Sequence, residues 1–225
     1  MFNVFSGDTD SIMFCKRNMN PFTKEERSIL LDELNSLYPD HINWSDDGYF
    51  ETVVVLKAKN YILYDGKKIK IKGSSLRSSK LEASLKDIQK EFIDAIIYVR
   101  NNFLDIYNKY IYEAMNITDI KRWSSRKTIT SKTETSERAN ETKLMDAIAG
   151  SNYKEGDKCL VYFLEDASLC LAENYTGAYD KLKMTERVFK CIQVFANVID
   201  MTPFLNYKLK KNKKALDELL VRSKT

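Results

Sequence analysis

The chain has 225 residues, of which 44% are hydrophobic and 30% charged, and this composition excludes an intrinsically disordered protein. No run approaches the ~20 apolar residues of a membrane-spanning helix, and the N-terminus lacks a signal-peptide pattern, so we expect a cytoplasmic protein without membrane partners. The net charge of +4 conceals an asymmetry, because residues 1–56 carry −6 and the remainder +10. An acidic end joined to a basic body favours a cation site beside a surface that binds a polyanion.

Cysteine and histidine usage excludes several further classes of site. The four cysteines have no C-x-x-C spacing, and the single histidine has no partner residues. A zinc site, a disulfide framework and histidine-based catalysis are therefore not expected, and the cysteines are expected to be reduced. The residues concerned are Cys15, Cys159, Cys170, Cys191 and His41.

The first 40 residues predict a hairpin followed by a helix. Apolar strands at 4–5 and 12–14 flank the polar run 6–11, which turns the chain. A helix is predicted to begin after the N-cap Thr23, with Glu26 completing a capping box, and to end at Pro39.

The next segment predicts a small antiparallel sheet. Residues 50–56 are rich in β-branched side chains, and 61–64 and 68–71 are further short strands. Asp65-Gly66 is predicted to link the last two strands as a tight hairpin.

From about Ser79 the apolar spacing changes to that of helices. The apolar positions from 81 to 96 predict a helix of about five turns, and a second helix is expected over 102–115. Later elements are a strand around 127–131, a helix over 136–149, a strand over 158–164 and a helix through 184–198 that Pro203 ends. The fold class is α+β, with one domain over residues 1–76 and a mostly helical domain over 77–225.

The acidic turn at Asp8-Thr9-Asp10 is the most informative feature of the sequence. At a tight turn both carboxylates can approach one cation, and hard oxygen ligands suit Mg²⁺, which usually takes one or two protein carboxylates together with substrate phosphates. Gly7 would allow close approach of the backbone. The alternative is a purely structural polar turn, since Gly and Asp are common in turns.

The string FSGDTDSI over residues 5–12 resembles the palm motif of family B DNA polymerases, a Tyr-Gly-Asp-Thr-Asp-Ser hairpin between hydrophobic strands. Ser6 stands where the family usually has Tyr, which leaves the carboxylates untouched. Reverse transcriptases and viral RNA polymerases use an Asp-Asp pair instead, so the intervening Thr9 favours the DNA polymerase interpretation.

A second match follows in the expected order. Lys59-Asn60-Tyr61 resembles the family's Lys-x-Tyr element, with Ala58 in place of a frequent first Lys, and Lys72-Gly73 resembles a later Lys-Gly pair. Residues 57–80 hold eight basic side chains and one acidic one, so this segment is suited to binding phosphates. The alternative is an ordinary solvated face of a sheet.

A later basic segment occurs among Ser and Thr hydroxyls and resembles the part of the family's thumb that follows the duplex. It could equally be a polar loop and helix face. Its basic residues are Lys121, Arg122, Arg126, Lys127, Lys132, Arg138 and Lys143.

The resemblance implies template-directed addition of a deoxynucleotide from a dNTP to a primer 3′-hydroxyl, with two Mg²⁺ ions. It implies Asp10 as the direct metal ligand, Asp8 as a second carboxylate, Lys59 and Tyr61 at the primer terminus, and Lys72 with Gly73 at backbone phosphate. Arg126 and Lys127 of the thumb would bind duplex DNA.

The family's second palm aspartate, its fingers lysine and its exonuclease domain are not recognised in these 225 residues. We therefore expect no polymerisation by this chain alone, and a partner that carries the N-terminal remainder: a separate subunit, or the missing part of a broken gene or longer reading frame. A viral or phage origin fits the composition. The alternative function is a non-catalytic module that binds primer-template or duplex DNA.

Overall fold

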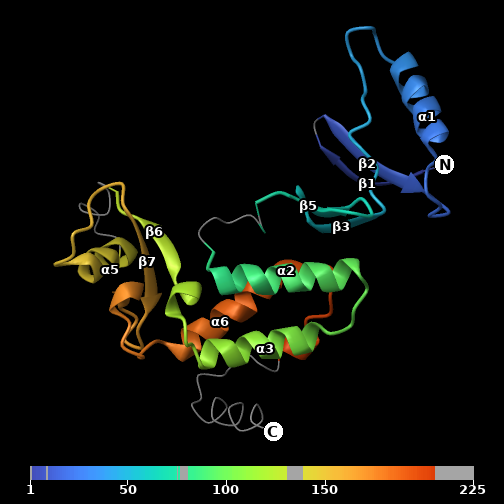
Figure 1. Ribbon diagram of the computed structural model, residues 1–225. Helices are drawn as coiled ribbons and strands as arrows, with labels where there is room; N and C mark the ends of the chain where they lie inside the picture. The colour runs from blue at the N-terminus through green and yellow to red at the C-terminus, as the bar shows by residue number, and fades with distance from the viewer. Residues whose placement is uncertain (1, 9, 75, 77–80, 131–138, 206–225) are drawn as a thin grey trace. The chain divides into compact units, whose positions relative to one another are not determined.

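The computed structural model describes residues 2–8, 10–74, 76, 81–130 and 139–205 (Figure 1). The chain divides into two compact units, Met1–Ser74 and Ser75–Thr225, which we call unit 1 and unit 2. Both contain helices and small antiparallel sheets, so the predicted α+β class is confirmed. In the described ranges, no helix has the length and apolar character that crossing a bilayer would require.

The first two strands form the predicted hairpin. β1 (Phe2–Asp8) pairs with β2 (Ser11–Lys16) in antiparallel register, with an irregularity between Val4 and Ser6. The strands are longer than predicted, because Asp8 is already the partner of Ser11. The turn is therefore two residues long, and the polar run that was predicted as a turn contributes to both strands.

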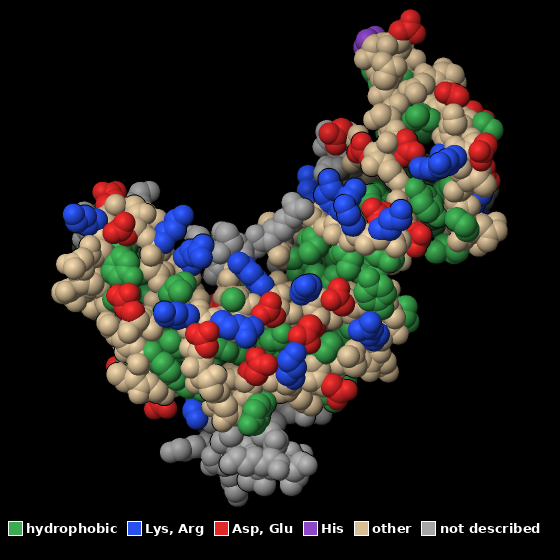
Figure 2. Space-filling model, viewed as in Figure 1, with side chains coloured by type: hydrophobic (Ala, Val, Ile, Leu, Met, Phe, Trp, Pro, Cys, Tyr) green, Lys and Arg blue, Asp and Glu red, His purple; other side chains and the backbone are tan. Residues whose placement is uncertain are grey.

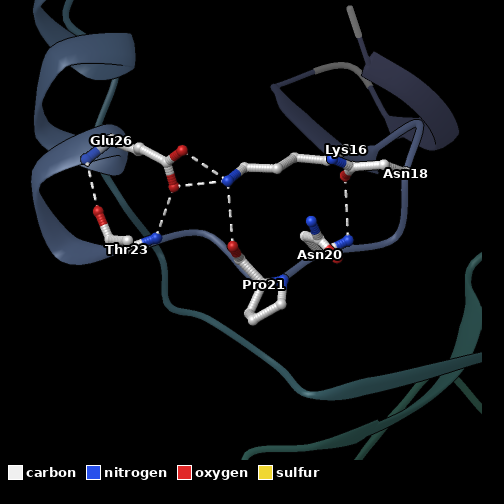
Figure 3. Close-up of polar contacts among 6 residues, drawn as sticks. All are labelled: Lys16, Asn18, Asn20, Pro21, Thr23 and Glu26. Carbon is white, nitrogen blue, oxygen red and sulfur yellow. Dashed lines mark hydrogen bonds and ion pairs between the residues drawn. The ribbon is translucent and has the colours of Figure 1, made fainter.

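Helix α1 (Lys24–Ser36) has the predicted capping box. The backbone N–H of Glu26 donates to Thr23 Oγ1 at 3.2 Å, and the backbone N–H of Thr23 donates to Glu26 Oε2 at 2.8 Å. Figure 3 shows that Lys16 at the end of β2 also reaches Glu26, at 2.6 Å, and the Pro21 carbonyl, at 3.1 Å. The hydrogen bond from Lys16, followed by that from Thr23, lowers the pKa of Glu26. The helix start is thereby tied to the hairpin.

The second sheet of unit 1 has the strand order β3-β4-β5 and is antiparallel throughout. Its strands are Thr52–Lys57, Asn60–Tyr64 and Ile69–Lys72. The connection between β4 and β5 is longer than the predicted Asp65-Gly66 link. The Asp65 carboxylate accepts from the backbone N–H groups of Lys67 and Lys68, at 2.9 and 2.7 Å.

Unit 2 is built on three helices that pack against one another (Figure 1). They are α2 (Ala83–Ile97), α3 (Phe103–Met115) and α6 (Lys181–Ile192). Phe92 lies at their centre, with ring centroids 5.5 Å from those of Phe103 and Phe195. Helix α2 begins at Ala83, after the N-cap Glu82, so the helix predicted from about Ser79 starts later than expected and Leu81 lies before it.

Polar contacts also join α6 to α2. Arg187 forms an ion pair with the buried Glu82, and the Cys191 thiol donates to the Leu85 carbonyl at 3.2 Å. Burial raises the pKa of Cys191 to about 12, so this cysteine is a packing group.

A small sheet follows in unit 2, with strand order β6-β7-β8. The strands are Ser125–Thr128, Lys158–Phe163 and Leu169–Leu171, and α5 (Ala139–Ile148) packs on them. The β7 prediction is confirmed, β6 begins earlier than predicted, and β8 was not predicted. The predicted helix residues 136–138 and strand residue 131 lie outside the described range.

The end of the described chain corrects one prediction. Helix α6 ends at Ile192 and a short 3-10 helix follows it, whereas the predicted helix ran through residue 198. Pro203 lies instead in the first turn of the short helix α7, where a missing backbone N–H is tolerated. The short helices are η1 (Ile120–Trp123), η2 (Ala172–Asn174), η3 (Gln193–Phe195) and α7 (Thr202–Leu205).

Candidate metal and nucleic-acid site

The two predicted acidic residues lie two positions apart at the turn end of the hairpin β1–β2. Asp8 is the last residue of β1, and Asp10 is an exposed turn residue just before β2. Gly7 does not have to be glycine for the hairpin itself, since an added Cβ would have its nearest neighbour, the Ser11 carbonyl, at 3.9 Å. The space beside Gly7 is therefore open.

The donor set at this turn fits Mg²⁺ in part. Two carboxylates without sulfur or imidazole are hard ligands, and Mg²⁺ keeps several waters and takes one or two carboxylates together with phosphates. Within the described ranges, no three Asp, Glu, His or Cys side chains gather as a metal cluster. The magnesium site predicted at this turn therefore stays a prediction.

Aromatic packing supports the far end of the same hairpin. The rings of Phe2, Phe14 and Phe22 lie with centroids 5.4 to 5.8 Å apart, and Lys16 Nζ lies 5.0 Å from the centre of the Phe22 ring. The segment leading into α1 is thus fixed on β1 and β2. This packing lies at the end of the hairpin away from the acidic turn.

The turn between β3 and β4 holds the first part of the basic site. Lys57 is the register partner of Asn60, so Ala58 and Lys59 form the turn, and Lys59 has a left-handed φ of 60°. The phenol oxygen of Tyr61 accepts a hydrogen bond from the Lys59 backbone N–H at 3.1 Å. The predicted lysine and tyrosine are therefore joined through the backbone of the turn.

Strand β5 brings the second part of the basic site to the first. Lys72 is the register partner of Tyr61. Gly73 follows with φ of +92°, and a Cβ there would lie 2.6 Å from Asn60 Cγ and closer still to the Lys59 carbonyl oxygen. This position requires glycine for both reasons. The structure thus brings together Lys59, Tyr61, Lys72 and Gly73, which are up to 14 residues apart in the sequence.

One face of this sheet, which we call the basic face, carries exposed lysines on its edge strand β5 beside the apolar Val53, Val55 and Leu63. Lys70 and Lys72 alternate along β5 with Ile69 and Ile71, so they share the face that also carries Tyr61. Lys70 Nζ lies 5.4 Å from the centre of the Phe50 ring. Figure 2 shows lysine and arginine side chains gathered over this sheet. Such a surface can bind phosphate groups while its aromatic rings contact sugars or bases.

Asp65 is the acidic residue of this segment. Among the described residues, no ion pair joins it to a lysine of the basic face. Asp65 is held by the backbone N–H groups of Lys68 and Lys67, and these hydrogen bonds lower its pKa. Its charge therefore stabilises the loop between β4 and β5. Arg77 and Lys80, which belong to the predicted basic segment, lie outside the described residues.

The predicted thumb residues form a separate group in unit 2. Arg126 and Lys127 are exposed neighbours on β6, so their side chains point to opposite faces of the strand. Arg122 forms an ion pair with Asp87 at 2.6 Å, which engages part of its charge. Lys132 and Arg138 lie outside the described residues. This group is less concentrated than the basic face of unit 1.

Asn60 lies among the candidate site residues, and the sequence analysis did not single it out. It is only 6% exposed, and its Nδ2 donates to the Ala58 carbonyl at 2.8 Å. The available signal was weak: asparagine is common in turns because its side chain bonds to nearby backbone. Its burial depends on Gly73, which only the pairing of β4 with β5 brings close.

Comparisons with known proteins support the fold. No protein-family model and no curated protein sequence matches the chain. Among solved structures, the family B DNA polymerase from the hyperthermophilic archaeon Pyrobaculum calidifontis is similar, with a TM-score of 0.67 and 16% sequence identity over 88% of this chain. The chain spans about 27% of the length of that polymerase. At this identity the similarity concerns the fold alone, and the chain has a polymerase-like fold.

Proposed function

We propose that this chain is the C-terminal palm and thumb portion of a DNA-directed DNA polymerase similar to those of family B. The observation that carries the proposal is the clustering of Lys59, Tyr61 and Lys72 on one basic sheet end, in the unit that also holds the acidic turn. The polymerase-like fold supports the same assignment. Unit 1 would be the palm portion and unit 2 the thumb.

In this proposal, the acidic turn contributes to a two-magnesium site. Asp10 would bind the ions directly and Asp8 would be the second carboxylate, together with an aspartate from another segment. When bound, the ions supply Lewis-acid stabilisation of charge at the transferring phosphoryl group. The short turn would keep the carboxylates in place, so that little reorganisation is needed during the reaction.

The basic face would hold the primer strand. Lys59 and Tyr61 would position the primer terminus so that its 3′-hydroxyl attacks the α-phosphorus of a dNTP and pyrophosphate leaves. Lys72 would contact backbone phosphate beside Gly73, which leaves room for close approach. Arg126 and Lys127 of unit 2 would contact the duplex through phosphates. These contacts position the strands but carry no sequence information, so selection of the incoming base would come from pairing with the template.

The proposal includes a partner segment that completes the palm and supplies the fingers. The hairpin β1–β2 exposes Val4 by 66% and Ile12 by 47%. Among the described residues, β1 and β2 pair only with each other. A two-stranded hairpin is marginal in water unless a further element covers it. The N-terminal remainder of a polymerase, in a separate chain or in a longer form of this one, would cover these side chains and bring the missing aspartate.

A second candidate function is an alternative to the polymerase proposal. It is a duplex-binding module without catalysis, and the exposed Lys70 and Lys72 on β5 are sufficient to support it. In that case Asp8 and Asp10 form a structural turn, and only the basic face and unit 2 are functional.

Reconstitution tests the proposal. The chain is mixed with a chain that carries the missing palm aspartate and fingers lysine, and primer extension is measured with Mg²⁺. We expect extension only in the mixture. Asp10→Ala should lower its rate by more than about 100-fold, since even the loss of groups that merely support metal ligands costs 10–100-fold. Asp47→Ala, which removes an exposed carboxylate elsewhere in unit 1, is the matched control and should leave the rate unchanged.

The outcomes separate the two functions. Extension that survives Asp10→Ala would remove the acidic turn from the mechanism. Primer-template binding without extension in any mixture would leave the DNA-binding module as the function.

A further inference from the structure

A buried amide lies at the centre of the basic site. Asn60 is the buried polar residue of unit 1 among those that the structure describes, and it stands between the proposed DNA contacts Lys59 and Tyr61. Buried polar groups are costly unless they are hydrogen-bonded, so an amide at this position needs a structural or functional reason.

The amide closes the turn that presents Lys59. Asn60 Nδ2 donates to the Ala58 carbonyl at 2.8 Å, across the residue with left-handed φ. Lysine rarely adopts that conformation, because its Cβ then crowds the following carbonyl. Surrounding contacts must therefore hold Lys59 in it.

Gly73 forms the other half of the same support. Its backbone lies directly against the Asn60 amide and the Lys59 carbonyl, so closely that no Cβ fits. It also directly follows Lys72, the register partner of Tyr61. This contact therefore joins the turn β3–β4 to the end of β5, and it fixes the backbone of Lys59 relative to that of Lys72.

We propose that Asn60 and Gly73 are positioning residues that hold Lys59 ready for a phosphate of the primer strand. This inference rests on the proposed function of the basic face. In this inference Asn60 does not contact DNA itself. It holds Lys59 in the position from which Lys59 contacts DNA. Arranging the lysine before binding lowers the cost of ordering it when the phosphate arrives.

The test measures binding of a primer-template duplex to the full chain by fluorescence anisotropy, as a function of salt concentration. The slope of log K against log salt falls by about 0.9 for each phosphate contact that is lost. We expect Lys59→Asn, which keeps a residue tolerant of positive φ but removes the charge, to lower the slope by about 0.9. Asn60→Ala should lower it by a similar amount, although it removes no charge.

The double variant identifies the route of the effect. If Asn60 acts through Lys59, adding Asn60→Ala to Lys59→Asn produces no further change in slope or affinity. Additive losses would overturn the inference, because Asn60 would then act independently of Lys59. Asn60→Ser, whose shorter side chain lacks the Nδ2 donor, should lower the slope as Asn60→Ala does.

Matched controls separate positioning from loss of folding. Asn43→Ala removes a comparable bond, from Nδ2 to the Asp40 carbonyl at 3.2 Å, and should leave the slope unchanged. Gly73→Ala should reproduce Asn60→Ala, whereas Gly66→Ala, where an added Cβ meets the flexible Glu51 side chain, should not. Circular dichroism checks that each variant is folded, and Asn60→Ser replaces Asn60→Ala if the latter unfolds.

Failure of the inference differs from failure of the proposed function. If Lys59→Asn and Lys72→Gln both leave the slope unchanged, the basic face does not bind DNA and both proposals fall. If these two variants lower the slope but Asn60→Ala and Gly73→Ala do not, the DNA site stands and the positioning role is wrong.

Discussion

Unit 1 and unit 2 differ in how they are held together. In unit 2, three helices close around a continuous set of buried side chains that includes Phe92, Phe195 and Phe204. Among the described residues of unit 1, the buried apolar side chains are Leu56, Ile62 and Leu63, all from the sheet β3-β4-β5 or its edge. The residues proposed for chemistry lie on the unit with the smaller core. Unit 2 therefore has a substantial core of its own, whereas few apolar side chains are buried in the described part of unit 1.

Helix α1 illustrates this difference. All of its side chains are exposed or half-buried, and Leu37 at its end is 76% exposed. Helix α2 of unit 2 buries eight residues over a similar length. Short helices are marginal in water, and most of their stability in proteins comes from packing of an apolar face. The capping box and the Lys16–Glu26 pair give α1 local support but no core.

The largest expected effect is loss of the unit 2 core. Phe92→Ala removes a fully buried ring that contacts three other aromatic rings, and it should lower the free energy of unfolding by about 3–5 kcal/mol. Chemical denaturation followed by circular dichroism measures this change. The control Leu37→Ala in unit 1 should change the free energy by no more than about 0.5 kcal/mol. Comparable losses from the two variants would break the contrast between the units.

Hydrogen exchange should show the contrast residue by residue. We expect backbone amides of β1 and β2 to exchange at least about 100-fold faster, after correction for intrinsic rates, than amides in the middle of α2 and α3. The reason is that the hairpin can open without exposing a core. Exchange measured by mass spectrometry or NMR provides the test. Addition of the chain that completes the polymerase should slow exchange in the hairpin while the helices stay unchanged.

A smaller effect of opposite sign is expected at the end of α2. The Arg100 N–H donates to the Ala95 carbonyl at 2.8 Å, and the Val99 N–H to the Ile96 carbonyl at 3.3 Å, which is the hydrogen-bond pattern of a Schellman motif. Val99 occupies the left-handed position, with φ of 51°, and is 92% exposed.

Val99→Gly should therefore stabilise unit 2, by about 0.5–1 kcal/mol, because relief of the strain exceeds the extra entropy of glycine in the unfolded chain. Thermal unfolding measures the shift. Val55→Gly, in strand β3 of unit 1, is the matched control and should destabilise. A loss of stability at Val99 would show that this valine makes a stabilising contact.

The smallest effect concerns acid stability. Burial raises the pKa of Glu91. Hydrogen bonds from Lys109, at 2.7 Å, and Tyr110, at 2.8 Å, together lower it by more than burial raises it, so the pKa lies below its usual value of 4.5. A lowered folded-state pKa means that the stabilisation is present above that usual value and is lost as the pH falls through the folded-state pKa.

Glu91→Gln should thus flatten the fall in stability of unit 2 from about pH 5 downward. Urea denaturation at a series of pH values measures it, with Glu165→Gln as a control on an exposed glutamate of the same unit. An unchanged pH profile in Glu91→Gln would assign the acid sensitivity to other carboxylates.

Local signals in the sequence predicted those elements whose causes are local. The Thr23 and Glu26 capping box and the hairpin around the acidic turn depend on neighbours within a few residues, and the structure confirms both. The prediction missed the end of α6, and it missed β8, a three-residue strand that pairs with β7 across a short turn and is too short to show a clear alternating pattern.

The candidate site shows the same division. Motif order identified Lys59, Tyr61, Lys72 and Gly73 one by one. Their convergence, and the role of Asn60 between them, follow from the pairing of β4 with β5. No local sequence pattern predicts that the Gly73 backbone contacts the Lys59 carbonyl, because Lys59 lies in the turn between β3 and β4 whereas Gly73 follows β5.

The unpaired edges of the hairpin β1–β2 also bear on how the protein behaves in the test tube. Each strand presents a row of backbone N–H and C=O groups that no other described strand occupies, and Val4 and Ile12 lie exposed beside them. Such an edge can pair with the same edge of another molecule. Concentrated preparations of the chain should therefore self-associate into dimers and larger species, with mass that rises with concentration in analytical ultracentrifugation, and a cognate partner should act as a solubilising agent.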